Sequence, residues 1–160
     1  MKYIKENRRE GNIDILGIYS KVFPKVMEYE DHNIWVNTKP GSGILMYTKL
    51  ILKEMKIDWD GSHINNRGKY NSINVERDIE FNDWEHTYLI DGLNRLDIRT
   101  TRQLLEHIKK NGHDKKIIFF TTSANDKIKK IMNNQKDFKC IDLDNNDRDV
   151  KIIKKINDFN

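Results

Sequence analysis

Short apolar runs alternate along this chain with stretches whose apolar residues recur at helical spacing, and this alternation constrains the fold more than any other feature. The apolar runs, each with the length of a buried strand, are residues 34–36, 87–91, 116–120 and 138–143. Helical spacing is found in residues 13–23, 43–56, 104–111, 125–134 and 148–159. Continuous apolar strands separated by amphipathic helices are typical of a parallel sheet that helices cover on both faces. The sequence therefore predicts an α/β fold, a three-layer sandwich of helices around a sheet of about five parallel strands.

The polar middle of the chain and the ends of two helices complete this prediction. A further strand is expected at residues 72–75 or at residues 79–81, where apolar residues interrupt a polar segment. The first helix is expected to end near Pro24, because proline disfavours helical geometry in the residue before it. Asp97 or Thr100 is expected to cap the third helix, since either side chain can accept a hydrogen bond from a free backbone N–H group.

The length of 160 residues is that of one ordinary domain. We interpret residues 1–30 as an N-terminal helical extension and residues 31–160 as the α/β core. No apolar run approaches the roughly 20 residues that cross a bilayer, and the charged residues 1–11 lack the apolar stretch of a secretory signal. Cys140 has no second cysteine with which to form a disulfide, so a reducing, cytoplasmic compartment is expected, without membrane association. The single cysteine and the spacing of the five histidines give no reason to assign a metal.

A glycine-rich turn separates the first apolar run from the strongly apolar helix at residues 43–56. Residues 38–45 read Thr-Lys-Pro-Gly-Ser-Gly-Ile-Leu. In a phosphate loop, backbone N–H groups and the positive end of a helix surround the phosphates, a lysine reaches the outer phosphates and a hydroxyl holds magnesium. The residues that a nucleotide would contact here are Lys39, Pro40, Gly41, Ser42 and Gly43. A plain tight turn into a helix is the alternative interpretation of the same residues.

With the later strands, this turn resembles the core of the AAA+ and related P-loop ATPases, especially the helicase-loader and replication-initiator group, over residues 34–156. The resemblance implies that Asp91 corresponds to the metal-associated carboxylate at the end of a strand, the alternative being a structural role there. It also implies that Thr122, within the polar cluster at 121–123, corresponds to the sensor that orients an attacking water. The alternative is that this cluster supplies turn and N-cap residues for the next helix. The helical lid of the family is expected to be absent, because the chain ends with the helix at 148–159 that would begin it.

The chain departs from that family at the positions that carry the chemistry. Ile44 stands where the family has its phosphate-binding lysine, and Leu45 stands where it has the magnesium-binding Ser or Thr. Gly92 replaces the acidic residue that follows Asp91 and activates water, and the segment 133–137 contains no arginine that could act on a neighbouring subunit. Without the lysine and the metal-binding hydroxyl, the electrostatic stabilisation on which phosphoryl transfer depends is lost. A domain that does not hydrolyse nucleotides is therefore expected.

An inactive domain of this kind points to a role in binding. The resemblance implies an accessory protein that binds a replication or mobile-element protein, such as a helicase or an intact ATPase. One alternative is a non-hydrolysing nucleotide-binding protein that holds ATP or ADP at the glycine-rich turn; no other cofactor is expected. The second alternative is a DNA-binding protein, because residues 104–160 contain 13 Lys and Arg against nine Asp and Glu and so carry the whole net charge of +4. The lysines expected to contact nucleic-acid phosphates are Lys109, Lys110, Lys115, Lys116, Lys129 and Lys130.

Overall fold

The computed structural model describes residues 15–29, 31–63, 74–93 and 97–144, and its centre is a five-stranded parallel sheet. The strands are β1 (Asn33–Thr38), β2 (Trp59–His63), β3 (Thr87–Leu93), β4 (Lys116–Thr122) and β5 (Phe138–Asp142), in the spatial order β2-β3-β4-β1-β5. The helices are α2 (Ile15–Met27), α3 (Ile44–Glu54), α4 (Val75–Asp78), α5 (Ile98–Asn111) and α6 (Asp126–Asn133). The predicted α/β fold with a parallel sheet is confirmed.

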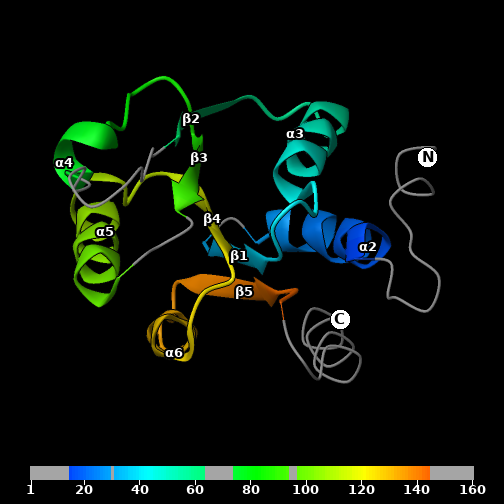
Figure 1. Ribbon diagram of the computed structural model, residues 1–160. Coiled ribbons are helices and arrows are strands. Elements are labelled where there is room, and N and C mark those ends of the chain that lie inside the picture. The colour runs from blue at the N-terminus through cyan, green and yellow to red at the C-terminus, as the bar shows by residue number, and fades with distance from the viewer. Residues whose placement is uncertain (1–14, 30, 64–73, 94–96, 145–160) are drawn as a thin grey trace.

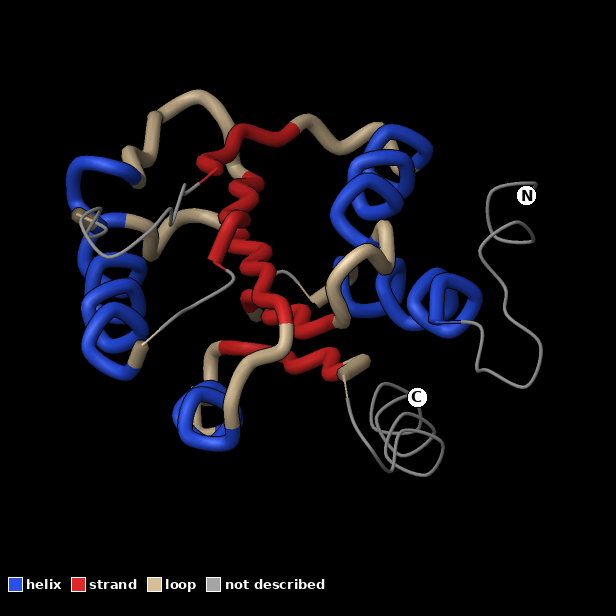
Figure 2. Tube along the Cα trace, viewed as in Figure 1, coloured by secondary structure: helices blue, strands red, loops and turns tan. Residues whose placement is uncertain are grey.

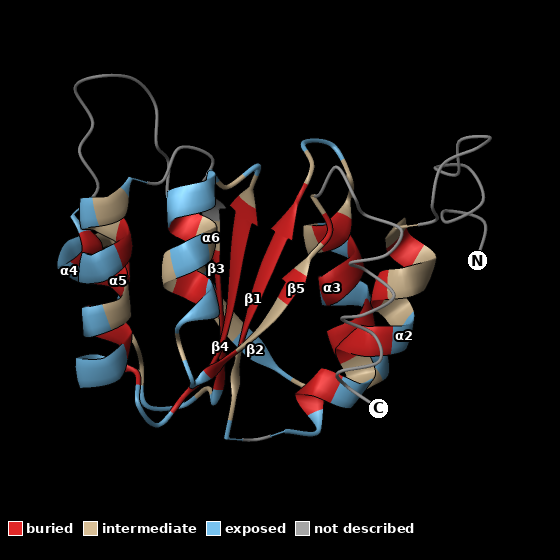
Figure 3. Ribbon diagram, turned by 90° about the horizontal axis from the view of Figure 1, so that it is seen from below, coloured by how far each residue is buried: buried red, intermediate tan, exposed pale blue. Residues whose placement is uncertain are grey.

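Helices cover both faces of the sheet (Figure 1, Figure 2). The pair α2 and α3 lies on one face, and α4, α5 and α6 lie on the other (Figure 3). Successive residues of a strand point to opposite faces. Ile34 and Val36 of β1 therefore pack against α2 and α3, whereas Trp35 packs against the helices of the other face. This is why residues 34–36 of β1 and 117–120 of β4 are apolar at every position rather than at every second one.

The strand predicted in the polar middle of the chain is β2, which lies at Trp59–His63 and not at either of the two predicted positions. Residues 79–81 follow the short helix α4 and belong to no strand, while residues 72 and 73 lie outside the described residues. β2 is an edge strand with a mostly polar sequence, so it lacks the apolar run that marks the other strands. Its middle residue, Gly61, permits a close approach to β3: a Cβ there would lie 2.7 Å from the carbonyl oxygen of Leu89.

The helix α2 continues through Pro24 to Met27, so the prediction that it ends near the proline is wrong. Proline removes one backbone N–H donor from a helix, but the burial of Val26 and Met27 in the core holds the last turn. The ammonium group of Lys116 donates hydrogen bonds to the backbone oxygens of Val26, at 3.4 Å, and of Tyr29. A positive charge at this end of the helix also interacts favourably with the helix dipole.

The helix α2 packs in the same apolar cluster as α3 and β1. The hydroxyl of Tyr19 shares a hydrogen bond with Thr48 of α3, and the burial of this phenol raises the pKa of Tyr19 well above its ordinary value. The hydroxyl of Thr48 in turn donates to the backbone oxygen of Ile44 at 2.8 Å. The described part of the predicted N-terminal extension is therefore packed into the core. Residues 1–14 and the predicted last helix at 148–159 lie outside the described residues.

Asp97 is the N-cap of α5, one of the two candidates for this position. Its carboxylate accepts a hydrogen bond from the backbone N–H group of Thr100 at 2.6 Å, and this bond lowers the pKa of Asp97. We expect Asp97→Ala to lower the free energy of unfolding by about 1 kcal/mol at neutral pH. Because the folded-state pKa is depressed, this stabilisation is present above the ordinary pKa of 3.8 and is lost as the pH falls through the lower folded value.

Urea unfolding at neutral and at acidic pH measures this contribution. The difference between wild type and Asp97→Ala should narrow in acid, because the protonated carboxyl group is a poorer acceptor. Asp97→Asn is the matched control, since asparagine caps a helix without titrating and should keep most of the stability at both pH values. A difference of the same size at both pH values would show that the ionised carboxylate is not what stabilises α5.

Candidate functional site

The carboxyl ends of β1 and β4 meet where the chain changes direction across the sheet. From β1 the chain passes to α3 on one face, and from β4 it passes to α6 on the other face (Figure 3). In open α/β sheets, ligands bind in the crevice outside the ends of two such strands. Thr38 of β1 is paired with Thr122 of β4, and the backbone N–H group of Ser123 donates to the oxygen of Thr38 at 2.9 Å. The structure therefore brings the glycine-rich turn and the predicted sensor cluster together.

The glycine-rich turn has the features of a type II β-turn, followed by a second glycine with positive φ. The backbone N–H group of Ser42 donates to the oxygen of Lys39 at 3.3 Å, so Pro40 and Gly41 occupy the two central positions. Gly41 has a φ of 72°, and Gly43, the N-cap of α3, has a φ of 77°. Residues with a Cβ rarely adopt such angles. The two glycines are thus required by the path of the chain from β1 into α3, whether or not a ligand binds.

The position that the resemblance assigns to a phosphate-binding lysine lies in the apolar core. Ile44 is 1 % exposed and packs in the cluster that joins α2, α3 and the sheet. Leu45, which stands in place of the magnesium-binding hydroxyl, is partly buried against the same cluster. Lys39, on the turn itself, is partly exposed. The first turn of α3 therefore contributes packing where an ATPase would place its charge and its metal ligand.

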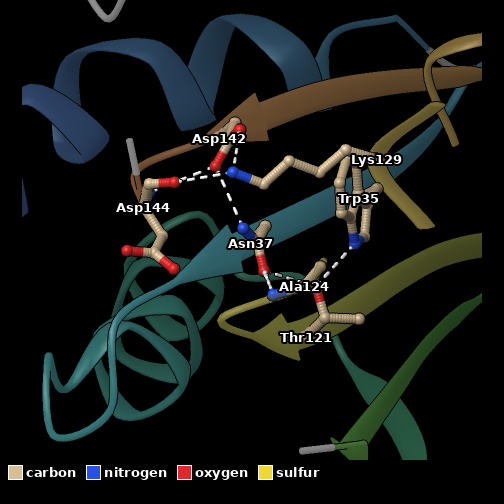
Figure 4. A network of polar contacts seen from close by, with 7 residues as sticks. All are labelled: Trp35, Asn37, Thr121, Ala124, Lys129, Asp142 and Asp144. Carbon is tan, nitrogen blue, oxygen red and sulfur yellow. Dashed lines mark hydrogen bonds and ion pairs between the residues drawn. The ribbon is translucent and has the colours of Figure 1, made fainter. Parts of the chain in front are cut away.

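A buried polar network centred on Asn37 joins the carboxyl ends of β4, β1 and β5 (Figure 4). Asn37 is fully buried, and its side-chain oxygen accepts from the hydroxyl of Thr121 at 2.8 Å and from the backbone N–H group of Ala124 at 3.0 Å. Its side-chain nitrogen donates to Oδ1 of Asp142 at 3.0 Å. The indole Nε1 of Trp35 donates to the hydroxyl of Thr121 at 2.8 Å. These side chains hold three neighbouring strand ends in place.

An ion pair extends the network to α6 (Figure 4). Nζ of Lys129 lies 3.3 Å from Oδ2 of Asp142 and donates to the backbone oxygen of Asp144 at 2.8 Å. The backbone N–H group of Asp144 donates to Oδ1 of Asp142 at 3.1 Å. The side chains of Lys129 and Asp142 are only 21 % and 12 % exposed, so water screens their attraction weakly. The polar side chains of the network are thus bonded to other groups of the protein.

The sequence pattern did not predict this network. A signal was present in Asn37, Thr121 and Asp142, each of which is a polar residue at the end of a predicted strand. Because the carboxyl ends of neighbouring parallel strands meet at one edge of a sheet, such residues can contact one another. The order of the strands, which decides the neighbours, had to come from the structure.

Comparison of the chain with known protein families, with curated proteins and with solved structures gives no match. Within the described residues, no group of three His, Cys, Asp or Glu side chains is placed to hold a metal ion. None of the described helices has the length and apolar character needed to span a membrane.

Asp91 and the polar cluster at 121–123 take positions that differ in part from those expected. Asp91 lies on β3, which continues to Leu93, and β4 separates this strand from β1. The β3–β4 register shifts between Ile90 and Leu93, so Asp91 lies at an irregularity within the strand rather than at its last residue. The cap of α6 is Asn125, whose side chain accepts from the backbone N–H group of Ile128 at 2.9 Å. The expectation that the cluster supplies the N-cap is therefore wrong.

The six candidate lysines do not lie on one open surface. Lys115 and Lys116 are only 9 % and 3 % exposed, and the ammonium group of Lys116 is bound to the end of α2. Lys129 is paired with Asp142 in the polar network. Burial therefore removes two of these side chains from any phosphate-binding surface, and the ion pair occupies a third. The exposed members of the set are Lys109, Lys110 and Lys130.

Proposed function

We propose that this chain is a catalytically inactive P-loop-like domain that works as an accessory protein, by binding a replication or mobile-element protein such as a helicase or an ATPase. The observation that supports this most directly is the burial of Ile44, 1 % exposed at the position where the resemblance requires a lysine. Phosphoryl transfer depends on positive charge and a metal ion held at the phosphates. An isoleucine packed in the core supplies neither, and we therefore infer binding rather than hydrolysis.

The polar groups near the turn support the same proposal. The hydroxyl of Thr38 donates to the hydroxyl of Ser42 at 2.9 Å, so these two groups are bonded to each other. Asn37 and Thr121 are bonded within the buried network. The polar side chains at the end of β1 and in the turn are thus hydrogen-bonded to other groups of the protein.

One observation favours the nucleotide-binding alternative. The N-cap of α3 is Gly43, which has no side chain that could accept a hydrogen bond from the first turn of the helix. Backbone N–H groups at a helix N-terminus attract anions. A nucleotide held by these groups and by Lys39 would be bound without being hydrolysed.

Calorimetric titration of the wild-type chain with ATP and ADP, in the presence of magnesium, distinguishes the two functions. We expect no binding heat and no change in melting temperature at millimolar nucleotide. A nucleotide that bound the folded state would raise the melting temperature. Lys39→Ala is the matched control, since Lys39 is the basic residue of the turn. Micromolar binding that is weakened in Lys39→Ala would contradict our proposal and support the nucleotide-binding alternative.

Affinity capture from an extract of the native host addresses the partner. We expect a helicase or an ATPase to be recovered and to bind the purified chain in calorimetry. Recovery of nucleic acid alone, with binding weakened by Lys109→Glu and Lys110→Glu, would favour the DNA-binding alternative instead.

A further inference from the structure

Among the described residues, no helix covers the β2 edge of the sheet face that carries α2 and α3. Gly61 of β2 is paired with Leu89 of β3, and paired residues point to the same face, so Gly61 lies on the α3 side. The ring of Trp59 lies on this side as well, because a Cβ built on Gly61 would be 3.3 Å from it. Both residues are exposed, Trp59 to 37 %. The described helices therefore leave this part of the face uncovered.

The outward side of the helix α3 carries exposed apolar side chains. Met46 and Leu50, which are one helical turn apart, are 63 % and 46 % exposed. They lie on the side of α3 opposite to its buried residues Ile44 and Ile51. Exposed apolar side chains that lie next to one another are typical of interaction sites, whereas single exposed ones are common on any surface.

Positive charge surrounds these apolar side chains. Lys49 and Lys53 are exposed on the same side of α3, and Nζ of Lys49 lies 5.0 Å from the centre of the Trp59 ring. Within the described part of the chain, neither lysine forms an ion pair. Residues 39–60 contain four lysines and three acidic residues, of which Asp60 lies on the opposite face of the sheet, because it is paired with Tyr88. A molecule that covers this surface therefore has to combine apolar groups with negative charge.

We propose that these side chains form a docking face for an amphipathic helix of a partner protein, with an excess of Asp and Glu beside its apolar residues. The docking face consists of Met46, Lys49, Leu50, Lys53, Trp59 and Gly61. This inference rests on the proposed function, because it specifies the protein partner. A helix lying beside α3 would cover the exposed methionine, leucine and tryptophan with residues spaced by one turn, and would place carboxylates against the two lysines.

Charge disfavours a second copy of the chain as the occupant. A twofold contact through the docking face would place the same patch of both copies together. Lys49 and Lys53 of one copy would then approach the same lysines of the other. Like charges brought together in an interface oppose association. An acidic helix would bury the apolar side chains and pair with the lysines. A second copy would bury the apolar side chains but leave the lysines without opposite charge.

The test uses the full chain as bait for selection from a displayed library of random helical peptides, followed by calorimetry with one selected peptide made by synthesis. We expect the selected peptides to combine an excess of Asp and Glu with apolar residues at helical spacing. M46Q/L50Q and K49E/K53E should each weaken binding by roughly tenfold or more, and added salt should weaken binding to the wild type. All four positions are exposed, so both variants should keep the wild-type melting temperature.

Two variants away from the docking face are matched controls. Trp84→Ser removes a tryptophan that is 79 % exposed, and K109E/K110E reverses two exposed lysines of α5 on the other face of the sheet. Both should bind the peptide as the wild type does. The docking proposal is overturned if no peptide is selected, if the peptides lack acidic excess, if the docking-face variants bind normally, or if M46Q/L50Q dissociates a wild-type dimer in sedimentation. Nucleotide binding by the wild type would instead contradict the proposed function, so the two failures are distinguishable.

Discussion

Ile44→Lys is expected to lower the free energy of unfolding by about 4 kcal/mol and to leave the chain unable to bind nucleotide. The substitution restores the residue of a phosphate loop, but at a position that is 1 % exposed within the cluster formed by α2, α3 and the sheet. A lysine there loses the packing of the isoleucine. It must also bury its charge without a partner, give up its proton, or displace neighbouring side chains to reach water. Each of these routes lowers the free energy of unfolding several times as much as a substitution at an exposed position does.

Urea unfolding of wild type and variant measures this loss, and two further variants serve as controls. Ile44→Leu keeps the volume and the apolar character and should cost less than about 1.5 kcal/mol. Leu45→Lys places the same charge one residue later, where the side chain is only partly buried, so it should cost less than lysine at position 44. If Ile44→Lys is as stable as the wild type and binds ATP with magnesium, position 44 can face a phosphate site, and the burial of Ile44 no longer supports our proposed function.

Asn37→Leu is expected to lower the free energy of unfolding by about 3 kcal/mol, although leucine is close to asparagine in size. The change removes the acceptor that Thr121 and the backbone of Ala124 use, and it removes the donor to Asp142. Asp142 would keep its ion pair with Lys129 but lose its side-chain hydrogen bond to β1, which stays paired with β5 through the backbone. A buried polar group that loses its partner keeps its desolvation cost, and so the loss exceeds the net contribution of the bonds themselves.

Thr121→Val is the matched control for Asn37→Leu, because it removes a hydroxyl from the same network and leaves the ion pair in place. We expect it to cost about 1 kcal/mol, and we expect the double variant to cost less than the two single variants combined, since both remove the same hydrogen bond. Urea unfolding of the four proteins gives this comparison. Additive costs, or a cost for Asn37→Leu within the roughly 0.5 kcal/mol of an ordinary surface change, would show that the network does not hold the strand ends.

The elements that the sequence predicted correctly are those whose own residues carry the signal. β4 is buried at every position from Lys116 to Thr121, and the centre of this strand, residues 117–120, appears in the sequence as a continuous apolar run. β2 has no such run, because an edge strand has fewer neighbours to pack against and Gly61 contributes only a close approach to Leu89. The last turn of α2 depends on Lys116, which lies far away along the chain. Local patterns contain no information about such contacts.

Part of the candidate site could likewise be predicted from the sequence, and part of it depends on the tertiary structure. The sequence by itself determined the turn between β1 and α3, because Gly41 and Gly43 permit positive φ, and it determined the absence of a lysine and a hydroxyl at positions 44 and 45. Only the tertiary structure decided that β1 lies between β4 and β5, which brings Asn37 to Thr121 and Asp142, 84 and 105 residues away along the chain. It also decided that the outward side of α3 is exposed while Lys115 and Lys116 are buried. Backbone preferences act over a few neighbouring residues, whereas polar pairing and burial depend on which strands and helices are adjacent in space.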